Sequence, residues 1–296
     1  METEQRKEKS EPIEFSIILT VHNKESLVGK VVKSIIEHTK TPFELVVVYD
    51  GCTDRSEEVV NSALAEANGE MKKLTVVYQP DVFQIKANNA GMKAASGEYF
   101  ILIDDDIIIN ENGWEQRIIR PFLKFDDVFA VSGRSAHNST ISRFHWLKHK
   151  AIIFFRGLLN IQPANYVGIP GLRPTEMWDI QTNPNLPRNI FAIRNICVRA
   201  PLAFRADRVK AMNYFDEAYA PYTWDDHDIC YRAYKEHKWV SGAYVIDYTS
   251  KIEWGTIRNK NQGLFQRMYR QNVVLLYNRH KDMINSPRHD ENRVLE

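Results

Sequence analysis

The sequence predicts an α/β fold in which a Rossmann-like, mostly parallel central sheet is flanked by helices within a single domain. Short apolar runs alternate with helix-like segments through the first third of the chain, the pattern of repeated βαβ units. Polar side chains follow each of these runs, as they do where parallel strands end at a ligand site. The 296 residues, 44% of them hydrophobic, suffice to bury a large core, and no internal repeat or second domain is apparent.

The elements of the first third can be assigned in order. Four apolar runs of strand length predict strands over residues 15–21, 43–50, 74–79 and 98–104. Between them, apolar residues at helical spacing predict helices over residues 25–38, 56–68 and 86–96. Right-handed crossovers then make the sheet parallel. The polar residues at the strand ends should converge at one edge, namely Thr20, His22, Asn23, Asp50, Gln79 and an aspartate run at 104–106.

Composition excludes several classes of protein. Lys and Arg number 39 against 38 Asp and Glu, so no overall positive field favours nucleic acid. The three cysteines, Cys52, Cys197 and Cys230, form no metal or disulfide pattern, which is typical of a reducing compartment. Residues 1–13 read as a charged, flexible tail, and no apolar run reaches the roughly 20 residues that span a bilayer. We therefore expect a cytoplasmic protein without a transmembrane segment.

The run Asp104-Asp105-Asp106 follows the last of the four apolar strands. In an extended chain Asp104 and Asp106 share a face while Asp105 points away, so Asp105 should be the most replaceable of the three. Two neighbouring carboxylates repel unless a cation or a shared proton relieves them, and Mg²⁺ or Mn²⁺ suits such a pair. The alternative is a solvated strand end that binds no ligand.

The surroundings of this run resemble a known family. The segment ANNAGMKAASGEYFILIDDD (87–106) is similar to the A-R-N-x-G-x-x-x-A-x-G-E-Y-x-x-x-x-D-x-D segment of family 2 glycosyltransferases, which have the GT-A fold. Asn88 stands where the family usually has Arg. ILTVHNKESLVGKVVKSI resembles the family's first strand and helix, and VVVYDGCTDRS (46–56) resembles its D-G-S-x-D-x-S turn. FDEAYAPYTWDDHDICYRAYKEHKW (215–239) resembles its F-D-E and acid-pair segment, so the resemblance runs over residues 14–255.

The resemblance implies an enzyme that moves a sugar from a nucleotide sugar, with UDP favoured, to a hydroxyl of a glycan, a glycolipid or a related acceptor. By this resemblance Asp50 binds the base, residues Thr20 and His22 lie beside the base and ribose, and Asp104 contacts the ribose. The full set of residues expected at the nucleotide is Thr20, His22, Asn23, Asp50, Lys86, Asn89, Asp104 and Asp105. The implied boundaries are a nucleotide-sugar half over 14–110 and an acceptor half over 111–255.

The resemblance also implies a metal ion, Mn²⁺ or Mg²⁺, that bridges the diphosphate. Asp106 would be its ligand together with Asp104. Many family members add a histidine further along the chain, where this sequence reads KIEWGT (251–256), so Glu253 is the candidate for the third ligand, with His22 and His227 as alternatives.

The Asp225-Asp226 pair matches the acid pair of the family, whose second member is the catalytic base. The resemblance therefore implies that Asp226 removes the proton of the acceptor hydroxyl, that Asp225 orients the acceptor or the loop, and that transfer inverts the anomeric carbon. Asp228 should pair with Arg232 one helical turn later. The alternative is an acidic helix start capped by Thr223 that complements the helix dipole without catalysis.

Two segments match no motif. Residues 134–195 form an acceptor-side insertion, whose aromatic residues Trp146, Tyr166 and Trp178, with Trp224 beyond it, could stack on a sugar or simply fill a core. Residues 256–296 form a helical extension bearing Arg258, Lys260, Arg267 and Arg270. This extension could contact the diphosphate, lie on a membrane that carries a lipid-linked acceptor, or pack as an ordinary helix.

Two other functions stay open at this point. A sugar nucleotidylyltransferase uses a similar sheet but needs a glycine-rich, basic nucleotide loop, which VHNKES does not supply. A non-catalytic module that binds a glycan or a nucleotide sugar would keep the pocket without the base. The donor sugar and the acceptor depend on pocket shape and cannot be assigned from these motifs.

Overall fold

The computed structural model describes residues 14–66, 68–133, 151, 186–194, 197, 201–251, 254, 262–284 and 291–295. The first third contains the seven elements that the sequence predicts, in the predicted order. They are β1 (Phe15–Val21), α1 (Val28–His38), β2 (Phe43–Asp50), α2 (Ser56–Glu66), β3 (Met71–Gln79), α3 (Phe83–Ala94) and β4 (Tyr99–Asp104).

The remaining chain supplies shorter elements. Before the segment 134–185, of which residue 151 alone is described, come β5 (Ile108–Ile109), α4 (Trp114–Lys124) and β6 (Val128–Ser132). After it come β7 (Ile190–Arg194), β8 (Leu202–Arg205), α7 (Ala206–Ala211), η4 (Glu217–Tyr219), α8 (Asp225–His237), β9 (Val240–Ala243) and β10 (Tyr248–Thr249). The chain ends with α9 (Gln262–Ile284) and β11 (Glu291–Val294).

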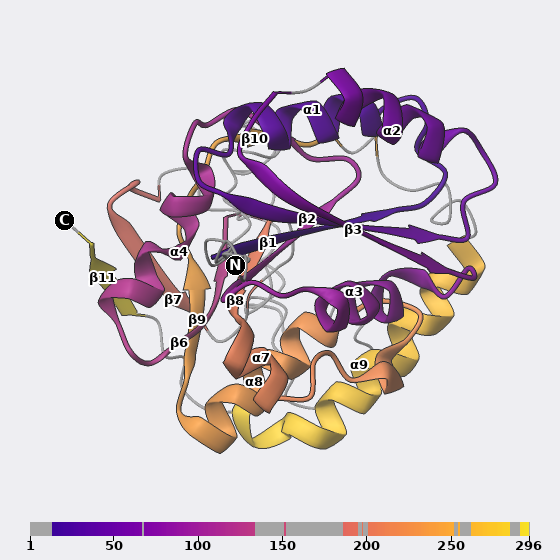
Figure 1. Ribbon diagram of the computed structural model, residues 1–296. Helices are drawn as coiled ribbons and strands as arrows, with labels where there is room; N and C mark the ends of the chain where they lie inside the picture. The colour runs from indigo at the N-terminus through magenta and orange to yellow at the C-terminus, as the bar shows by residue number, and fades with distance from the viewer. Residues whose placement is uncertain are drawn as a thin grey trace, which may run out of the picture.

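A nine-stranded sheet forms the central layer, in the order β11-β7-β9-β6-β8-β4-β1-β2-β3 (Figure 1). β1 pairs in parallel with β2 and β4, and β2 pairs in parallel with β3. Among the described strands, β7 and β8 run against the other members of the sheet. The predicted mostly parallel sheet is therefore confirmed, and the carboxyl ends of β1, β2, β3 and β4 lie at one edge.

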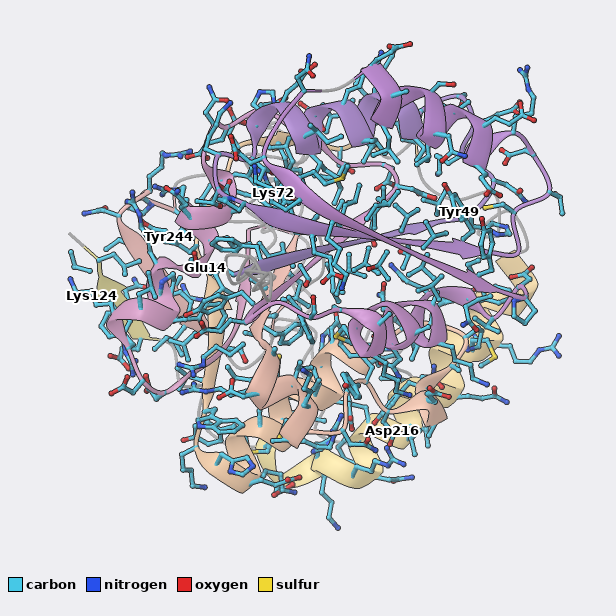
Figure 2. All side chains as sticks on the ribbon, viewed as in Figure 1. Glu14, Tyr49, Lys72, Lys124, Asp216 and Tyr244 are labelled. Carbon is cyan, nitrogen blue, oxygen red and sulfur yellow. The ribbon has the colours of Figure 1, made fainter. Side chains whose placement is uncertain are left out.

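Helices cover both faces of the sheet, and two apolar cores fill the spaces between (Figures 1 and 2). The helices α1, α2 and α4 pack on one face, while α3, α7, α8 and α9 pack on the other. Alternate residues of β1 contribute to the two cores, since Ile17 and Leu19 belong to the first and Ile18 to the second. A Cβ on Gly91 of α3 would lie 2.5 Å from Ile18, so glycine lets this helix approach the sheet closely.

The C-terminal segment contains the predicted helix and also completes the sheet. α9 packs against α8, and β11 pairs antiparallel with β7 as an edge strand that the sequence did not predict. Arg267 and Arg270 are exposed on α9, whereas Arg258 and Lys260 lie outside the described residues. Within the described ranges no helix combines the length and the apolar character needed to cross a bilayer.

A buried carboxylate, Glu44 of β2, joins neighbouring strands at the edge of the sheet opposite the strand carboxyl ends. Its oxygens accept hydrogen bonds from Ser16 Oγ at 2.6 Å, Thr75 Oγ1 at 2.7 Å and the Ser96 backbone N–H at 2.8 Å. Lys73 Nζ lies 2.7 Å from the carboxylate. Burial alone would raise the pKa of Glu44, but Lys73 and these donors outweigh it and lower the pKa to about 2.

This pKa predicts an acid-sensitive contribution to stability. A folded-state pKa below the unfolded value contributes stability that is present above about pH 4.5 and lost as the pH falls toward about 2. We expect the difference in unfolding free energy between wild type and Glu44→Gln to shrink by about 3 kcal/mol over that interval, as measured by urea unfolding. The exposed Glu66, paired with Lys33, gives the matched control Glu66→Gln, whose curve should stay parallel to wild type. If the free energy of unfolding of Glu44→Gln changed with pH in parallel with that of wild type, the lowered pKa of Glu44 would be contradicted.

Candidate active site

The carboxyl ends of the parallel strands bring the predicted polar residues together. In the sheet register Thr20 lies opposite Val48 on one side and Asp104 on the other, so the ends of β1, β2 and β4 are level. Asp50 lies opposite Gln79 at the end of β3. The predicted convergence at one edge is therefore confirmed, and the loops that leave these strands line this edge.

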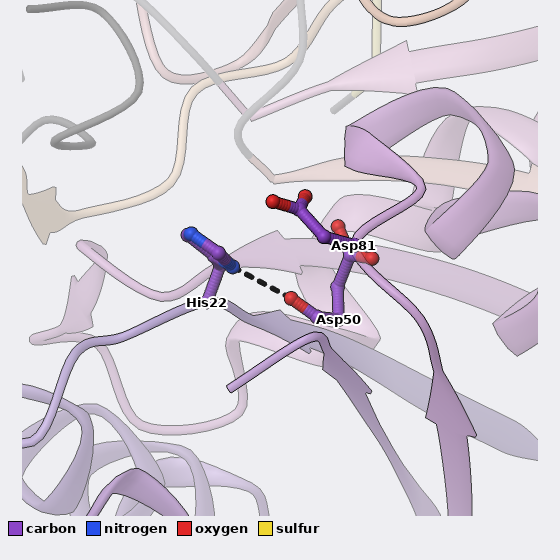
Figure 3. A group of neighbouring side chains, drawn as sticks. All are labelled: His22, Asp50 and Asp81. Carbon is purple, nitrogen blue, oxygen red and sulfur yellow. Dashed lines mark hydrogen bonds between the residues drawn. The ribbon is translucent and has the colours of Figure 1, made fainter. Parts of the chain in front are cut away.

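His22, Asp50 and Asp81 form a compact group at the ends of β1, β2 and β3 (Figure 3). Potential ligand atoms of the three side chains lie within 4.8 Å of one another. His22 Nδ1 lies 2.6 Å from the Asp50 carbonyl oxygen, to which it can donate, and Asp50 Oδ1 accepts from the Val82 N–H at 2.8 Å. Asp50 is buried, so its carboxylate is held in a defined place.

No pattern in the sequence singles out Asp81, although it lies only two residues after Gln79 at the end of β3. Gly51 explains how Asp81 comes so close to Asp50: it adopts a φ of +62°, and a Cβ there would lie 2.7 Å from Asp81 Cβ. Gly51 therefore allows both the turn after β2 and the close approach of Asp81 to Asp50.

Asn23 joins two loops of the site. Its Oδ1 accepts from the Thr53 N–H at 2.7 Å and from the Asp54 N–H at 3.3 Å. The loop after β1 is thereby tied to the turn after β2. Thr20 is buried beside Asp104, and Lys86 is exposed in the first turn of α3.

The three aspartates occupy different environments. Asp104 is partly exposed and accepts a hydrogen bond from Gln84 Nε2 at 2.9 Å. Asp105 is 7% exposed, accepts from the His22 N–H at 3.0 Å and lies 3.3 Å from Lys24 Nζ. Burial, and then the charges of Asp104 and Asp105, raise the pKa of Asp106 to about 7. Burial also raises the pKa of Asp105, against the attraction of Lys24.

This arrangement argues against the expectation that Asp105 is the most replaceable of the three. β4 ends at Asp104, and residues 105–106 form a turn, so the alternation of an extended strand no longer applies. The turn directs Asp105 inward to the backbone of His22 and to Lys24, where it holds the loops together.

Lys24 links the aspartate run to the C-terminal part of the chain. Its buried Nζ donates to the Trp254 carbonyl oxygen at 2.7 Å, and its backbone N–H donates to Ser56 Oγ at 2.7 Å. Trp254, the residue after Glu253 in the sequence, therefore contacts the same Lys24 side chain as Asp105. Glu253 itself lies outside the described residues.

The Lys24–Asp105 pair should have a large effect on stability because both side chains are buried. Lys24→Met leaves Asp105 beside two other carboxylates without its cation, and we expect the free energy of unfolding to fall by about 3 kcal/mol. Asp105→Asn in the Lys24→Met background should recover much of this loss, a coupling that urea unfolding of the double-mutant cycle measures. Lys72→Met, which breaks an exposed pair with Glu70, is the control. Additive effects of the two changes would contradict the coupling.

The acid pair lies at the start of α8. Asp225 is the first residue of the helix and is buried, and the Asp226 side chain is 14% exposed. Asp226 Oδ1 accepts from the His227 N–H at 2.9 Å and lies 2.6 Å from His227 Nδ1. The predicted Asp228–Arg232 pair is confirmed at 2.7 Å. The predicted cap is wrong, because Trp224 in a left-handed conformation occupies the N-cap position and Thr223 precedes it.

Contacts of α3 connect the aspartate run to the loop that leads into this acid pair. The ring of Phe83 stacks on Tyr222 with centroids 5.8 Å apart, and the Ile85 N–H donates to the Pro221 carbonyl at 3.5 Å. Gln84, between them in the chain, reaches Asp104. The first turn of α3 therefore separates the aspartate run from the loop that leads into α8.

Asn89, which was expected at the nucleotide, has a structural role instead. It is buried, and its amide donates to the Phe215 carbonyl at 2.9 Å while its oxygen accepts from the Phe215 N–H at 3.1 Å. A further bond reaches Glu217. Asn89 therefore joins α3 to the segment before α8.

Of the four candidate aromatic platforms, Trp224 is described. Its ring is 4% exposed and packs against His227 and Tyr269, with centroids 4.8 and 5.1 Å away. This favours the core role that was the alternative for Trp224. Trp146, Tyr166 and Trp178 lie outside the described residues.

Residues 16–176 match the family model described as glycosyl transferase family 2, which is more than half of the 296 residues. The chain belongs to glycosyl transferase family 2. Among its relatives, an uncharacterized glycosyltransferase of Nostoc sp. is 29% identical over 116 residues, 39% of this chain and 35% of that protein. Glycosyltransferase GlyG of Streptococcus pneumoniae is 29% identical over 99 residues, 33% of this chain and 32% of that protein. The matches thus span about a third of the length of these two relatives.

Solved structures confirm the fold of this family 2 chain. TarS of Staphylococcus aureus (residues 1–349), in complex with UDP-GlcNAc, has a TM-score of 0.56 at 17% identity, with 92% of this chain and 70% of that chain covered. Glucosyl-3-phosphoglycerate synthase of Mycobacterium tuberculosis, in complex with Mn²⁺, UDP and glucosyl-3-phosphoglycerate, has a TM-score of 0.54 at 16% identity, with 95% and 87% covered. At such identities the likeness shows the GT-A fold, as predicted.

The aspartate run of this glycosyltransferase-family chain suits a hard divalent cation. Three consecutive carboxylates lie at the end of β4 and in the turn that follows, and burial with the charges of Asp104 and Asp105 raises the pKa of Asp106 against the attraction of Lys24. Carboxylate oxygens are the ligands that Mg²⁺ and Mn²⁺ prefer, with phosphate and water completing the shell. Among the described residues, the group with three potential ligand atoms in reach of one another is His22, Asp50 and Asp81, which makes it the competing location.

Proposed function

We propose that this protein is an inverting, metal-dependent glycosyltransferase that moves a sugar from a UDP-sugar to a hydroxyl of a saccharide or lipid-linked acceptor. The observation that carries the proposal is that a family 2 chain brings the Asp50 cluster at the end of β2 and the aspartate run after β4 to one sheet edge. The first turn of α3 connects this edge to the loop that leads into the acid pair of α8.

The donor would bind over the ends of β1, β2 and β4. A carboxylate at Asp50 can accept the N3–H of uracil, which gives a site that discriminates against bases lacking a donor there. His22 and Thr20 flank this position, and Asp104 would contact the ribose. The UDP-GlcNAc bound to TarS and the UDP bound to the mycobacterial synthase support the choice of a uridine donor.

The metal would be held by Asp106 and Asp104, with Glu253 as the candidate third ligand. Bound Mn²⁺ or Mg²⁺ supplies positive charge that stabilises the diphosphate as the bond to the anomeric carbon breaks. The protein's own contribution is to keep these carboxylates together, which Asp105 does through Lys24 and the backbone of His22.

Asp226 would act as the general base. It accepts the proton of the acceptor hydroxyl while the hydroxyl oxygen attacks the anomeric carbon from the side opposite the diphosphate, which inverts that carbon. The two contacts of His227 with Asp226 Oδ1 fix the orientation of the carboxylate. Asp225, buried behind it, would hold the start of α8 in place.

A donor panel tests this function. UDP-, GDP- and other nucleotide sugars are offered with Mn²⁺, Mg²⁺ or EDTA, and release of the nucleoside diphosphate and thermal shifts are recorded. Metal-dependent release from a UDP-sugar is the expected result. Neither binding nor turnover with any donor would refute the proposal, and pyrophosphate release from a nucleoside triphosphate and a sugar phosphate would support a nucleotidylyltransferase instead.

A further inference from the structure

The C-terminal helix α9 holds the segment that leads into the proposed catalytic pair. Asn272 of α9 is 4% exposed, and its Nδ2 donates to the carbonyl oxygens of Tyr219 at 2.7 Å and Tyr222 at 3.0 Å. Thr223 offers two more acceptors at 3.4 and 3.5 Å. An amide has two N–H hydrogens, so the two shorter contacts are the hydrogen bonds and Thr223 lies at their margin.

This segment adopts a backbone that needs external support. Thr223 has a φ of +83° and Trp224 a φ of +70°, the left-handed region that β-branched and bulky residues rarely occupy. Such residues persist only where surrounding contacts determine their conformation. Asp225 follows Trp224 directly, so the contacts that fix these two residues also fix the start of α8.

Three other contacts of α9 lie on either side of the Asp225-Asp226 pair in the chain. Tyr269 packs against Trp224, with ring centroids 5.1 Å apart. His280 Nε2 lies 2.8 Å from Asp228 Oδ1, and Arg279 pairs with Asp216, labelled in Figure 2, at 2.5 Å. α9 therefore contacts the chain before and after residues 225–226.

We propose that Asn272 is a positioning residue for the Asp225-Asp226 pair. By donating to the Tyr219 and Tyr222 carbonyls, it holds the left-handed step at 223–224 and thereby sets where Asp226 meets the acceptor. The inference rests on the proposed function, since it assigns to the C-terminal helix a part in placing the base. It predicts an effect on turnover without an effect on donor binding, because the donor groups lie on β1, β2 and β4.

The test is Asn272→Asp, which keeps the shape of the side chain but turns the donor into an acceptor facing two carbonyl oxygens. We expect kcat to fall about 10- to 100-fold, because small misplacements of a catalytic group have effects of this size. The KM for the UDP-sugar and the thermal shift given by UDP with Mn²⁺ should stay within about twofold of wild type. Asn272→Ala removes both donors without adding a charge and provides the same comparison if the Asp variant does not fold.

Two controls on the same helix separate positioning from general damage. Asn278→Asp makes the same chemical change at an exposed position and should behave like wild type. Leu276→Ala removes buried packing without touching the carbonyls, so it should lower the melting temperature but keep kcat at temperatures where it is folded.

Hydrogen–deuterium exchange over residues 219–228 gives a readout that does not depend on activity. The Asn272 variants should exchange faster there, with unchanged exchange over 99–106. Unchanged exchange over 219–228, or a kcat equal to that of Leu276→Ala, overturns the inference. If wild type turns over no donor, the proposed function fails, and the exchange comparison alone decides whether Asn272 holds this segment.

Discussion

Asp226→Asn should abolish sugar transfer and leave donor binding intact. Asparagine has the same shape, and its Oδ1 can still accept both hydrogen bonds from His227, so the start of α8 should keep its geometry. What the variant loses is the ability to take a proton, and we expect kcat to fall about 10²- to 10⁴-fold. Nucleoside diphosphate release measures kcat, and thermal shift with UDP and Mn²⁺ measures donor binding.

A control distinguishes catalysis from a simple helix-dipole role. Asp207 is an exposed acid in the first turn of α7, so Asp207→Asn makes the same change at another helix start. If Asp226 served only the dipole, both variants would lose about 0.3 to 1 kcal/mol of stability and keep their turnover. Unchanged turnover in Asp226→Asn would remove the base assignment. Donor binding by wild type without any turnover would favour the non-catalytic binding module.

The elements of the first third could be predicted because buried parallel strands read as uninterrupted apolar runs. FELVVVYD gives β2 with its observed bounds, although it hides Glu44, whose charge is neutralised only by residues of neighbouring elements. β11 could not be predicted, since the sequence ENRV is short, polar and largely exposed, and its pairing with β7 depends on a contact about a hundred residues away.

The residues of the candidate site likewise fall into those that the sequence predicts and those that it cannot predict. Residues at strand ends, such as Asp50 and Asp104, were predictable because strand topology alone fixes where they lie. Lys24 could not be found, because its role depends on contacts with Asp105 and with Trp254, and Trp254 is 230 residues later in the chain. The inward turn of Asp105 and the left-handed backbone of Thr223 and Trp224 before Asp225 depend on backbone geometry that no residue pattern predicts.

Alanine at Asp105 and alanine at Asp106 should fail in different ways, although the two residues are adjacent. Asp106→Ala removes the proposed metal ligand, and we expect the affinity for UDP in Mn²⁺ to fall about 10²-fold, to the level measured in EDTA. Because the Asp106 charge is disfavoured in the folded protein, its removal should not lower the free energy of unfolding and should raise it at pH values above the ordinary aspartate pKa of 3.8. Asp105→Ala removes the carboxylate that pairs with Lys24 and leaves the His22 N–H without its acceptor, and it should lower that free energy by about 2 to 3 kcal/mol.

Titrations of UDP with and without Mn²⁺, beside urea unfolding, separate these outcomes. Asp81→Ala is the decisive comparison, because His22, Asp50 and Asp81 are the described residues that bring three potential ligand atoms within 4.8 Å. If Asp81→Ala loses the Mn²⁺ dependence of UDP binding while Asp106→Ala retains it, the metal belongs to that group. If only Asp106→Ala loses the Mn²⁺ dependence of UDP binding, Asp106 is the metal ligand, and its raised pKa reflects a carboxylate whose charge the bound cation would balance. The role of the neighbouring Asp105 is then to hold the loop that carries Asp106.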